Sequence, residues 1–224
     1  MRIEPEALST VIPALNAAAI LPATIAALGG AAAEVVVADA GSTDGTPEVA
    51  RGLGATVIEA ARGRGTQLAA GVAAARGPWL LLLHADTCLA PGWAAEARDA
   101  MRDPDRAWFF RFALDDASPA ARRLERAVAW RCRVLGLPYG DQGLLVHRDL
   151  LEAAGGIRPL PLMEDVDLVR RIGRARLGAL DVAAVTSAAR WRRDGYLRRS
   201  ARNLACLSLW FLGVPPARIA RLYG

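Results

Sequence analysis

The chain has 224 residues, 53% of them hydrophobic, and a formal net charge of +5 at neutral pH. This length and composition fit one large domain with a sizeable buried core. All 28 basic residues are arginine, and they are spread along the chain rather than gathered into one basic run. Nucleic acid is therefore not the expected partner.

The cysteines and the amino terminus indicate the compartment. Cys88, Cys132 and Cys206 are far apart and form no CxxC pair, so neither a disulfide framework nor a zinc site is expected. Residues 1–10 hold two glutamates and lack the apolar core of a signal peptide. No apolar run reaches the roughly 18 to 20 residues of a membrane span. We expect a cytoplasmic protein with reduced cysteines.

The first hundred residues alternate short apolar runs with amphipathic helical patterns. Strands are predicted at residues 8–13, 34–39, 56–59 and 79–84, and helices at residues 17–28, 46–53, 65–76 and 92–101. Such alternation is typical of βαβ units on a parallel sheet, so the predicted fold class is α/β. The continuous apolar runs at 35–37 and 80–83 suit strands that helices cover on both faces.

Polar residues follow two of these strands. Asp39 ends one apolar run, and His84, Ala85 and Asp86 follow another. Because the carboxyl ends of parallel strands meet at one edge of the sheet, Asp39 and Asp86 are expected at the same edge, where ligands bind. A carboxylate there suits a divalent cation that carries phosphates.

The second half extends the same domain, since no long polar boundary interrupts it. Strands are predicted at residues 107–112 and 144–147, and helices at residues 119–135, 149–154 and 164–174. The domain is expected to span residues 1–196 and to be followed by a basic helical tail at residues 197–224.

The loop at residues 39–46 presents short oxygen side chains and backbone amides after a buried strand. Asp39 is not needed as a helix cap, so we expect it to contact a ligand. Asp44 is expected to cap the following helix, and Ser42 either contacts the ligand or completes the turn.

Five motifs in this order resemble the family 2 glycosyltransferases of the GT-A fold. They are VIPALN at 11–16, ADAGSTDGT at 38–46, HADT at 84–87, YGDQG at 139–143 and MEDVDL at 163–168. The last three also resemble the bacterial branch of radical-SAM and selenodomain-associated transferases. The resemblance implies a Rossmann-like, mostly parallel GT-A sheet flanked by helices.

The resemblance also implies a donor site. Pro13, Asn16, Ser42 and Ala85 would lie beside the nucleotide sugar, and Asp39 would accept hydrogen bonds from the base. Asp86 would ligate Mg²⁺ or Mn²⁺ on the diphosphate, whose growing charge the metal would neutralise.

Two positions depart from the family's usual motifs. His84 stands where an acid is usual, and Ala40 replaces the second acid of the DDGSTD pattern. His84 either contacts the metal or a phosphate, or is a hydrogen-bonded structural residue.

The segment at residues 62–67 resembles the basic, glycine-containing segment that approaches the nucleotide sugar in this family. Arg64 would contact a phosphate and Gln67 would lie beside it, because guanidinium matches phosphate geometry. The alternative is a solvated loop before a helix. The chain has no GxGxxG sequence and no P-loop lysine, which argues against a dehydrogenase or a nucleoside triphosphatase.

Glu164 and Asp165 are adjacent acids at the start of a predicted helix. The resemblance makes Asp165 the base that deprotonates the acceptor hydroxyl, with Glu164 beside it. The alternative for Asp165 is helix capping. Asp141 and Gln142 would line the same pocket, and Asp167 is expected on the exposed face of the helix.

The segment at residues 190–193 resembles one that many family members place over the diphosphate. Arg190 and Trp191 would then contact the donor, or Trp191 anchors a loop. The tail at 197–223 alternates arginine with leucine, tryptophan and phenylalanine. It is expected to lie on an anionic membrane surface, on the domain or on a second subunit.

The resemblance implies an inverting glycosyltransferase that moves a sugar from a nucleotide-diphosphate donor to an unidentified hydroxyl acceptor. The first alternative is a degenerate GT-A domain that only binds nucleotides or acts as a scaffold, as His84 and Ala40 would allow. The second is a nucleotidyltransferase, which should show a basic, glycine-rich loop after the first strand. VIPALNAAA has none.

Overall fold

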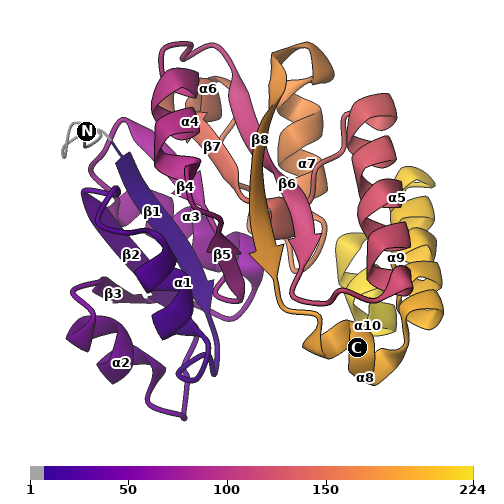
Figure 1. Ribbon diagram of the computed structural model, residues 1–224, viewed down its shortest axis with the longest axis horizontal. Coiled ribbons are helices and arrows are strands. Elements are labelled where there is room, and N and C mark those ends of the chain that lie inside the picture. Colours follow the sequence, from indigo (N-terminus) through magenta and orange to yellow (C-terminus); the bar gives the residue numbers. More distant parts are fainter. Residues whose placement is uncertain (1–7, 224) are drawn as a thin grey trace.

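A computed structural model describes residues 8–223, which fold around an eight-stranded sheet of order β3-β2-β1-β4-β7-β6-β8-β5 (Figure 1). The predicted βαβ series is confirmed in the first half. The strands are β1 (Leu8–Ala14), β2 (Glu34–Asp39), β3 (Thr56–Glu59) and β4 (Trp79–Leu82), all parallel to one another. The helices are α1 (Leu21–Ala27), α2 (Thr46–Gly52), α3 (Arg64–Ala74) and α4 (Trp93–Ala100).

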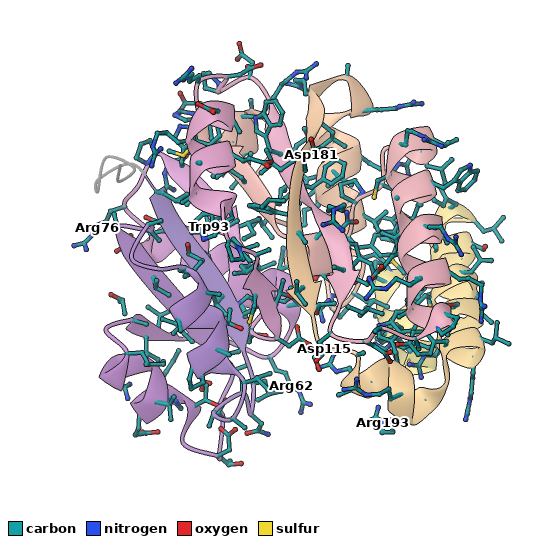
Figure 2. All side chains as sticks on the ribbon, viewed as in Figure 1. Arg62, Arg76, Trp93, Asp115, Asp181 and Arg193 are labelled. Atoms are coloured by element: carbon teal, nitrogen blue, oxygen red, sulfur yellow. The ribbon has the colours of Figure 1, made fainter. Side chains whose placement is uncertain are left out.

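The apolar strands are covered on both faces, as their continuous runs predicted. Val11, Val36 and Leu80 face the cluster that contains α3. Ile12, Val37 and Leu81 face the cluster that contains α1, α2 and α4. Trp93 of α4 lies in this second layer and donates its indole N–H to the Ala27 carbonyl of α1 at 3.1 Å (Figure 2).

The second half makes the sheet mixed. It adds β5 (Thr87–Leu89), β6 (Ala107–Leu114), β7 (Leu144–His147) and β8 (Leu177–Thr186). β7 runs antiparallel to β4 and β6, whereas β8 is parallel to β6 and antiparallel to β5. β5 and β8 were not predicted. β5 has only three residues, and the alanines of LGALDVAAVT weaken the apolar alternation that identifies a strand.

The later helices lie on the α3 side of the sheet or beyond its end (Figure 1). They are α5 (Pro119–Leu135), α6 (Arg148–Ala153), α7 (Glu164–Ile172), α8 (Ala189–Asp194), α9 (Tyr196–Phe211) and α10 (Pro216–Tyr223), with 3₁₀ turns η1 (Gly140–Gln142) and η2 (Arg174–Arg176). The expectation of one helix through 197–223 is wrong. Two prolines follow Gly213, and proline cannot continue a helix.

The tail contributes to the interior. Cys206 and Leu207 of α9 and Ile219 of α10 are buried in the cluster that covers one face of the sheet. α9 lies beside α5 in Figure 1. The division of the chain at residue 197 stays a prediction. None of the helices within residues 8–223 is both long and apolar enough to cross a bilayer.

Candidate functional site

A pocket of about 110 Å³ opens at the edge of the sheet where β4 and β8 end. Because β7 runs the opposite way, the turn η1 that precedes it reaches the same edge. Polar side chains from most of the length of the chain line the pocket: Arg64, His84, Asp86, Tyr139, Asp141, Asp165, Thr186, Ser187, Arg190, Arg199, Asn203 and Tyr223. The topology therefore gathers residues that are up to 159 positions apart in sequence.

Asp86 lies on the short connection between β4 and β5. Its carbonyl accepts hydrogen bonds from the Ser187 amide at 3.1 Å and the Thr186 hydroxyl at 3.3 Å. β5 then pairs with β8 from Thr87 onward. These contacts fix the backbone at Asp86 and leave its carboxylate at the pocket wall.

His84 lies beyond the end of β4, not inside the strand as predicted. Its imidazole is buried, and its Nε2 atom has no hydrogen-bond partner among the described residues. Burial, together with Arg64 and Arg190, holds the pKa of His84 well below its usual 6.5. The ring is therefore neutral at pH 7. The alternative that His84 is a hydrogen-bonded structural residue would need a partner at Nε2, and none is found among the described residues.

Asp165 connects α7 to the turn η1. Its Oδ2 atom accepts from the Gly140 amide and its Oδ1 atom from the Val166 amide, both at 2.7 Å. One oxygen thus accepts from the next amide of its own helix, and the carboxylate also lines the pocket. The N-cap of α7 is Met163, so Asp165 is not the helix cap that the alternative expected. Gly140 packs so tightly here that a Cβ atom would lie 2.5 Å from His84 Nε2.

Glu164 lies beneath the pocket and is 2% exposed. Neither of its carboxylate oxygens has a hydrogen-bond partner within residues 8–223, and Arg64 Nη1 approaches Oε1 only to 3.6 Å. Burial, reinforced by the charge of Asp165, raises the pKa of Glu164 from 4.5 to about 7. Arg64, the first residue of α3, opposes this shift.

Asp141 is also buried at the pocket wall, and its Oδ1 atom lacks a partner in the described part of the chain. Burial raises its pKa from 3.8 to about 6, against the attraction of Arg131. The Arg131 guanidinium lies over the Tyr139 ring, 3.4 Å from its centroid. Two protonatable acids, Asp141 and Glu164, therefore flank Asp165.

Asp39 organises the neighbouring loop. Its carboxylate accepts hydrogen bonds from the amides of Gly41 and Ser42 at 3.0 and 2.9 Å and from the Ser42 hydroxyl. Asn16, with a left-handed φ of 51°, accepts from the Thr43 amide and donates its own amide to Ser42. Asp39 and Ser42 line a separate hollow that reaches Arg62, which is labelled in Figure 2.

Asp44 accepts a hydrogen bond from the amide of Thr46, the first residue of α2, at 3.0 Å. The N-cap position itself is Gly45, so the expectation that Asp44 caps the helix is wrong by one residue. Asp44 also accepts from the Ala18 amide and ties the loop to the segment after β1.

Seven of the predicted donor contacts lie outside the lining of this pocket: Pro13, Asn16, Asp39, Ser42, Gln67, Ala85 and Gln142. Gln67 is buried and donates to the carbonyls of Ala14 and Ala38. Gln142 is buried and bonds Phe110, Tyr139 and Arg131. The expectation that Gln142 lines the pocket with Asp141 is therefore wrong, because backbone and neighbouring groups occupy its amide.

The expectation that Asp167 lies on an exposed helix face is also wrong. Its side chain is 8% exposed and pairs with Arg171 at 2.7 Å and Arg158 at 3.1 Å. Two guanidiniums compensate the burial of this carboxylate and hold the loop before α7 against the helix.

The position of Trp191 is compatible with both roles expected for it, contact with the donor and anchoring of a loop. Its ring is buried and stacks on Tyr196 with centroids 5.7 Å apart, so it anchors α8 to α9, and it also reaches the pocket with Arg190. Asp115, labelled in Figure 2, accepts from the Ala188 amide at 2.6 Å and secures the start of α8.

Three residues of the tail that line the pocket were not predicted from the sequence. Arg199 and Asn203 are one turn apart on the inner face of α9, and Tyr223 lies on α10. Asp194 pairs with Arg193, Arg199 and Arg202, and these contacts hold its pKa well below the usual range. The i, i+4 spacing of Arg199 and Asn203 was the available signal, but nothing local shows which face of α9 turns inward.

Comparison with known proteins adds two findings. Residues 9–155 match the model of the family described as glycosyl transferase family 2. No curated protein matches the chain.

Solved structures of similar fold include two sugar transferases. Glucosyl-3-phosphoglycerate synthase from Mycobacterium tuberculosis, in complex with Mn²⁺, UDP and phosphoglyceric acid, aligns with a TM-score of 0.63 and 20% identity over 94% of this chain and 80% of the synthase. Mannosyl-3-phosphoglycerate synthase from Rubrobacter xylanophilus aligns with a TM-score of 0.59 and 18% identity over 93% of this chain and 75% of that synthase. These likenesses confirm the predicted α/β fold class.

Proposed function

Because the chain belongs to glycosyl transferase family 2, we propose that it transfers a sugar, with inversion, from a nucleoside-diphosphate sugar to an acceptor hydroxyl. The observation that carries this proposal is the meeting of Arg64, Asp86, Asp141 and Asp165 in one pocket at the carboxyl edge of the sheet. Such a pocket offers cationic and anionic groups to a single reacting centre.

Asp165 is the general base in this proposal. The amides of Gly140 and Val166 fix the orientation of its carboxylate toward the pocket. From there it accepts the proton of the acceptor hydroxyl while the oxygen attacks the anomeric carbon opposite the leaving diphosphate. A single displacement of this kind inverts the configuration. Glu164 lies beneath the pocket next to Asp165. Its carboxylate pairs with the Arg64 guanidinium at 3.6 Å.

Arg64 and Arg190 stabilise the departing diphosphate. Both line the pocket on the same wall as His84, whose pKa they lower together. Fixed guanidiniums favour the charge that develops on the bridging oxygen as the sugar leaves.

The pocket residues fit a divalent cation. His84 Nε2 and Asp141 Oδ1 are buried without partners within residues 8–223, and Asp86 is beside them on the pocket wall. Asp86 and His84 would hold Mg²⁺ or Mn²⁺, which would neutralise charge on the diphosphate. No three histidine, cysteine or acidic side chains of the described part form a complete site, so phosphate oxygens and water would supply the remaining ligands. The M. tuberculosis synthase was crystallised with Mn²⁺ or Mg²⁺ and UDP.

The nucleotide would occupy the hollow beside the loop at 39–46. Asp39, Asn16 and Ser42 are already held in one network there, and Pro13 ends the neighbouring strand β1. Gln67 and Ala85 support the walls rather than reach the ligand. The motifs HADT, YGDQG and MEDVDL further support membership of the radical-SAM-associated branch.

The acceptor would enter between α7 and α9, where Asp165 faces Arg199 and Asn203. The phosphoglyceric acid bound in the M. tuberculosis synthase is anionic, and Arg199 of the tail would suit an anionic group here as well.

The first test is thermal shift with nucleoside diphosphates and nucleotide sugars, in Mn²⁺, in Mg²⁺ and in EDTA. We expect one nucleotide to raise the melting temperature in the presence of metal and to lose this effect in Asp86→Ala. Asp99→Ala, an exposed acid on α4, is the matched control and should behave as the wild type. Absence of a shift with every nucleotide would contradict the proposal.

His84 and Ala40 keep the degenerate, non-catalytic domain as a second candidate. It would bind a nucleotide in the same thermal-shift test. Hydrolysis of the stabilising nucleotide sugar, measured as metal-dependent release of nucleoside diphosphate, distinguishes the two, because only the transferase should show it.

A further inference from the structure

The molecule leaves one set of apolar side chains uncovered. Ten large hydrophobic side chains are exposed among residues 8–223, and eight of them lie on α5 or within residues 197–222. Scattered exposed leucines are ordinary on a protein surface, but a concentration on two adjacent helices marks an interaction site.

The exposed residues of α9 form one stripe. Leu197, Leu204 and Phe211 follow one another at intervals of about two helical turns and therefore lie on one face of the helix. Their exposed fractions are 88, 63 and 50%. Arg199 and Cys206 lie on the opposite side, toward the pocket and the core. α9 therefore serves the interior with one face. On the other face Arg170 of α7 lies over the Phe211 ring, 4.9 Å from its centroid, while Leu197 and Leu204 stay largely exposed.

α5 extends this stripe sideways. Trp130 is 53% exposed, and Val134 and Leu135 follow it on the last turn. α5 and α9 are in contact and lie side by side at one end of the molecule (Figure 1). We call the exposed side chains of α5 and α9, together with Leu212 directly after α9, the docking face.

The charge around the docking face is strongly one-sided. Residues 119–135 and 189–223 hold 13 arginines and only two acids, a net charge of +11, whereas the rest of the chain holds 15 arginines and 21 acids. The two acids, Glu125 and Asp194, are already paired with arginines of the same segments. The molecule thus has a basic, apolar end and an acidic remainder.

We propose that the docking face binds the surface of an anionic lipid bilayer, with α5 and α9 lying in the plane of the interface. Such a surface offers acyl chains to the leucines, phenylalanine and tryptophan and negative headgroups to the arginines around them. A second copy of the chain fits less well, because a twofold contact would bring together two copies of the segments 119–135 and 189–223, each with a net charge of +11.

The test is cosedimentation of the full chain with vesicles. We expect binding to vesicles of mixed phosphatidylglycerol and phosphatidylcholine, at least about tenfold weaker binding to phosphatidylcholine alone, and release at high salt. Leu204→Ser combined with Leu212→Ser should reduce binding to the anionic vesicles by about tenfold. The control is Ile20→Ser combined with Leu53→Ser, which removes two exposed apolar side chains, 41 and 42% exposed, beside α1 and α2 at the opposite end of the molecule.

Circular dichroism melting of both double variants shows that each is folded before binding is compared. The proposal is overturned if the wild type does not sediment with anionic vesicles, or if both double variants bind as the wild type does. It is also overturned if light scattering finds a dimer that only the Leu204/Leu212 variant dissociates, because the face would then be a subunit interface. Nucleotide thermal shift is independent of these outcomes and reports separately on the transferase proposal.

Discussion

Glu164 and Asp165 are neighbours in sequence but have opposite environments. Asp165 accepts two backbone N–H groups at the pocket wall, whereas Glu164 is buried with no hydrogen bond to either oxygen within the described residues. Adjacent positions on a helix point about 100° apart, so one faces the ligand and the other the layer beneath. The carboxylate of Asp165 can therefore act on a substrate, whereas the charge of Glu164 destabilises the folded state.

The pKa of Glu164 predicts a pH-dependent effect of Glu164→Gln on stability. The folded state binds a proton up to about pH 7 and the unfolded chain only up to about 4.5, so the wild type loses stability as pH rises between these values. Glutamine avoids this loss. In urea unfolding we expect the variant to exceed the wild type by about 1–3 kcal/mol near pH 8 and to match it near pH 4.5. A variant less stable than the wild type near pH 8 would show that the Arg64 pair outweighs the burial of the charge.

Asp165→Asn tests the assignment of the base. Asparagine keeps the size of the side chain and one acceptor oxygen but cannot take up the acceptor's proton. We expect kcat to fall by about 10²–10⁴-fold, with the melting-temperature shift caused by the nucleotide unchanged. Asp149→Asn, an exposed acid on α6, is the control and should keep full activity. An active Asp165→Asn enzyme would move the base to another pocket acid.

At the residue scale, the positions of the acids at the sheet edge could be predicted from the sequence, whereas the positions of the glutamine side chains could not. Asp39, Asp86 and Asp165 follow recognisable patterns at the ends of apolar runs or the start of a helix. Gln67 and Gln142 stand in the same motifs, but carbonyls and side chains from other elements occupy their amides. The burial of Asp167 likewise depends on Arg158, which reaches it from a loop whose path has no local signal.

At the scale of elements, the turn η1 and the segment after β4 meet too closely at Gly140 to admit a side chain. Gly140 gives its amide to Asp165, and a Cβ atom on it would approach the buried ring of His84. Gly140 therefore lies between Asp165 and His84 and is close to both side chains. Packing of this kind is sensitive to one added methyl group.

Gly140→Ala should lower the free energy of unfolding by about 1–3 kcal/mol and weaken metal-dependent nucleotide binding, because His84 must shift. Gly52→Ala is the matched control: its Cβ atom would meet nothing within 4 Å and its φ is not left-handed. Alanine there should be neutral or slightly stabilising. Urea unfolding of both variants measures the difference, and equal stabilities would mean that the η1 turn relaxes at no cost.

The elements themselves were predicted where hydrophobic periodicity is strong. The first four strands and their helices follow it directly. β8 did not, because alanine fills many of its positions and its burial comes from pairing with β6 over eight residues. The helical tail was recognised, yet its break after α9 and its inward face depend on packing against α5 and the core.

At the scale of the whole molecule, the tail is both a wall of the pocket and a part of the core. Cys206, Leu207 and Ile219 are each less than 10% exposed. If the domain ended at residue 196, these contacts and the pocket's Arg199, Asn203 and Tyr223 would be lost together.

Truncation after residue 196 is therefore expected to destabilise the chain by about 5 kcal/mol or more, since each large buried apolar side chain contributes about 1.5–3 kcal/mol. That is comparable to the whole stability of a typical domain, so cooperative thermal unfolding should be lost. Circular dichroism melting of residues 1–196 against the full chain measures this. A cooperative transition within a few degrees of the full chain's would instead establish the tail as a separable unit.

The parallel pairing of β6 with β8 has a consequence for synthesis on the ribosome. β6 leaves the exit tunnel well before its partner at Leu177–Thr186, and the arginines of α8 and α9 follow later still. The βαβ half can fold as it emerges, because its contacts are local. A nascent chain that has emerged only as far as β8 therefore presents Asp86, Asp141 and Asp165 in a pocket that still lacks the wall formed by Arg190, Arg199 and Asn203.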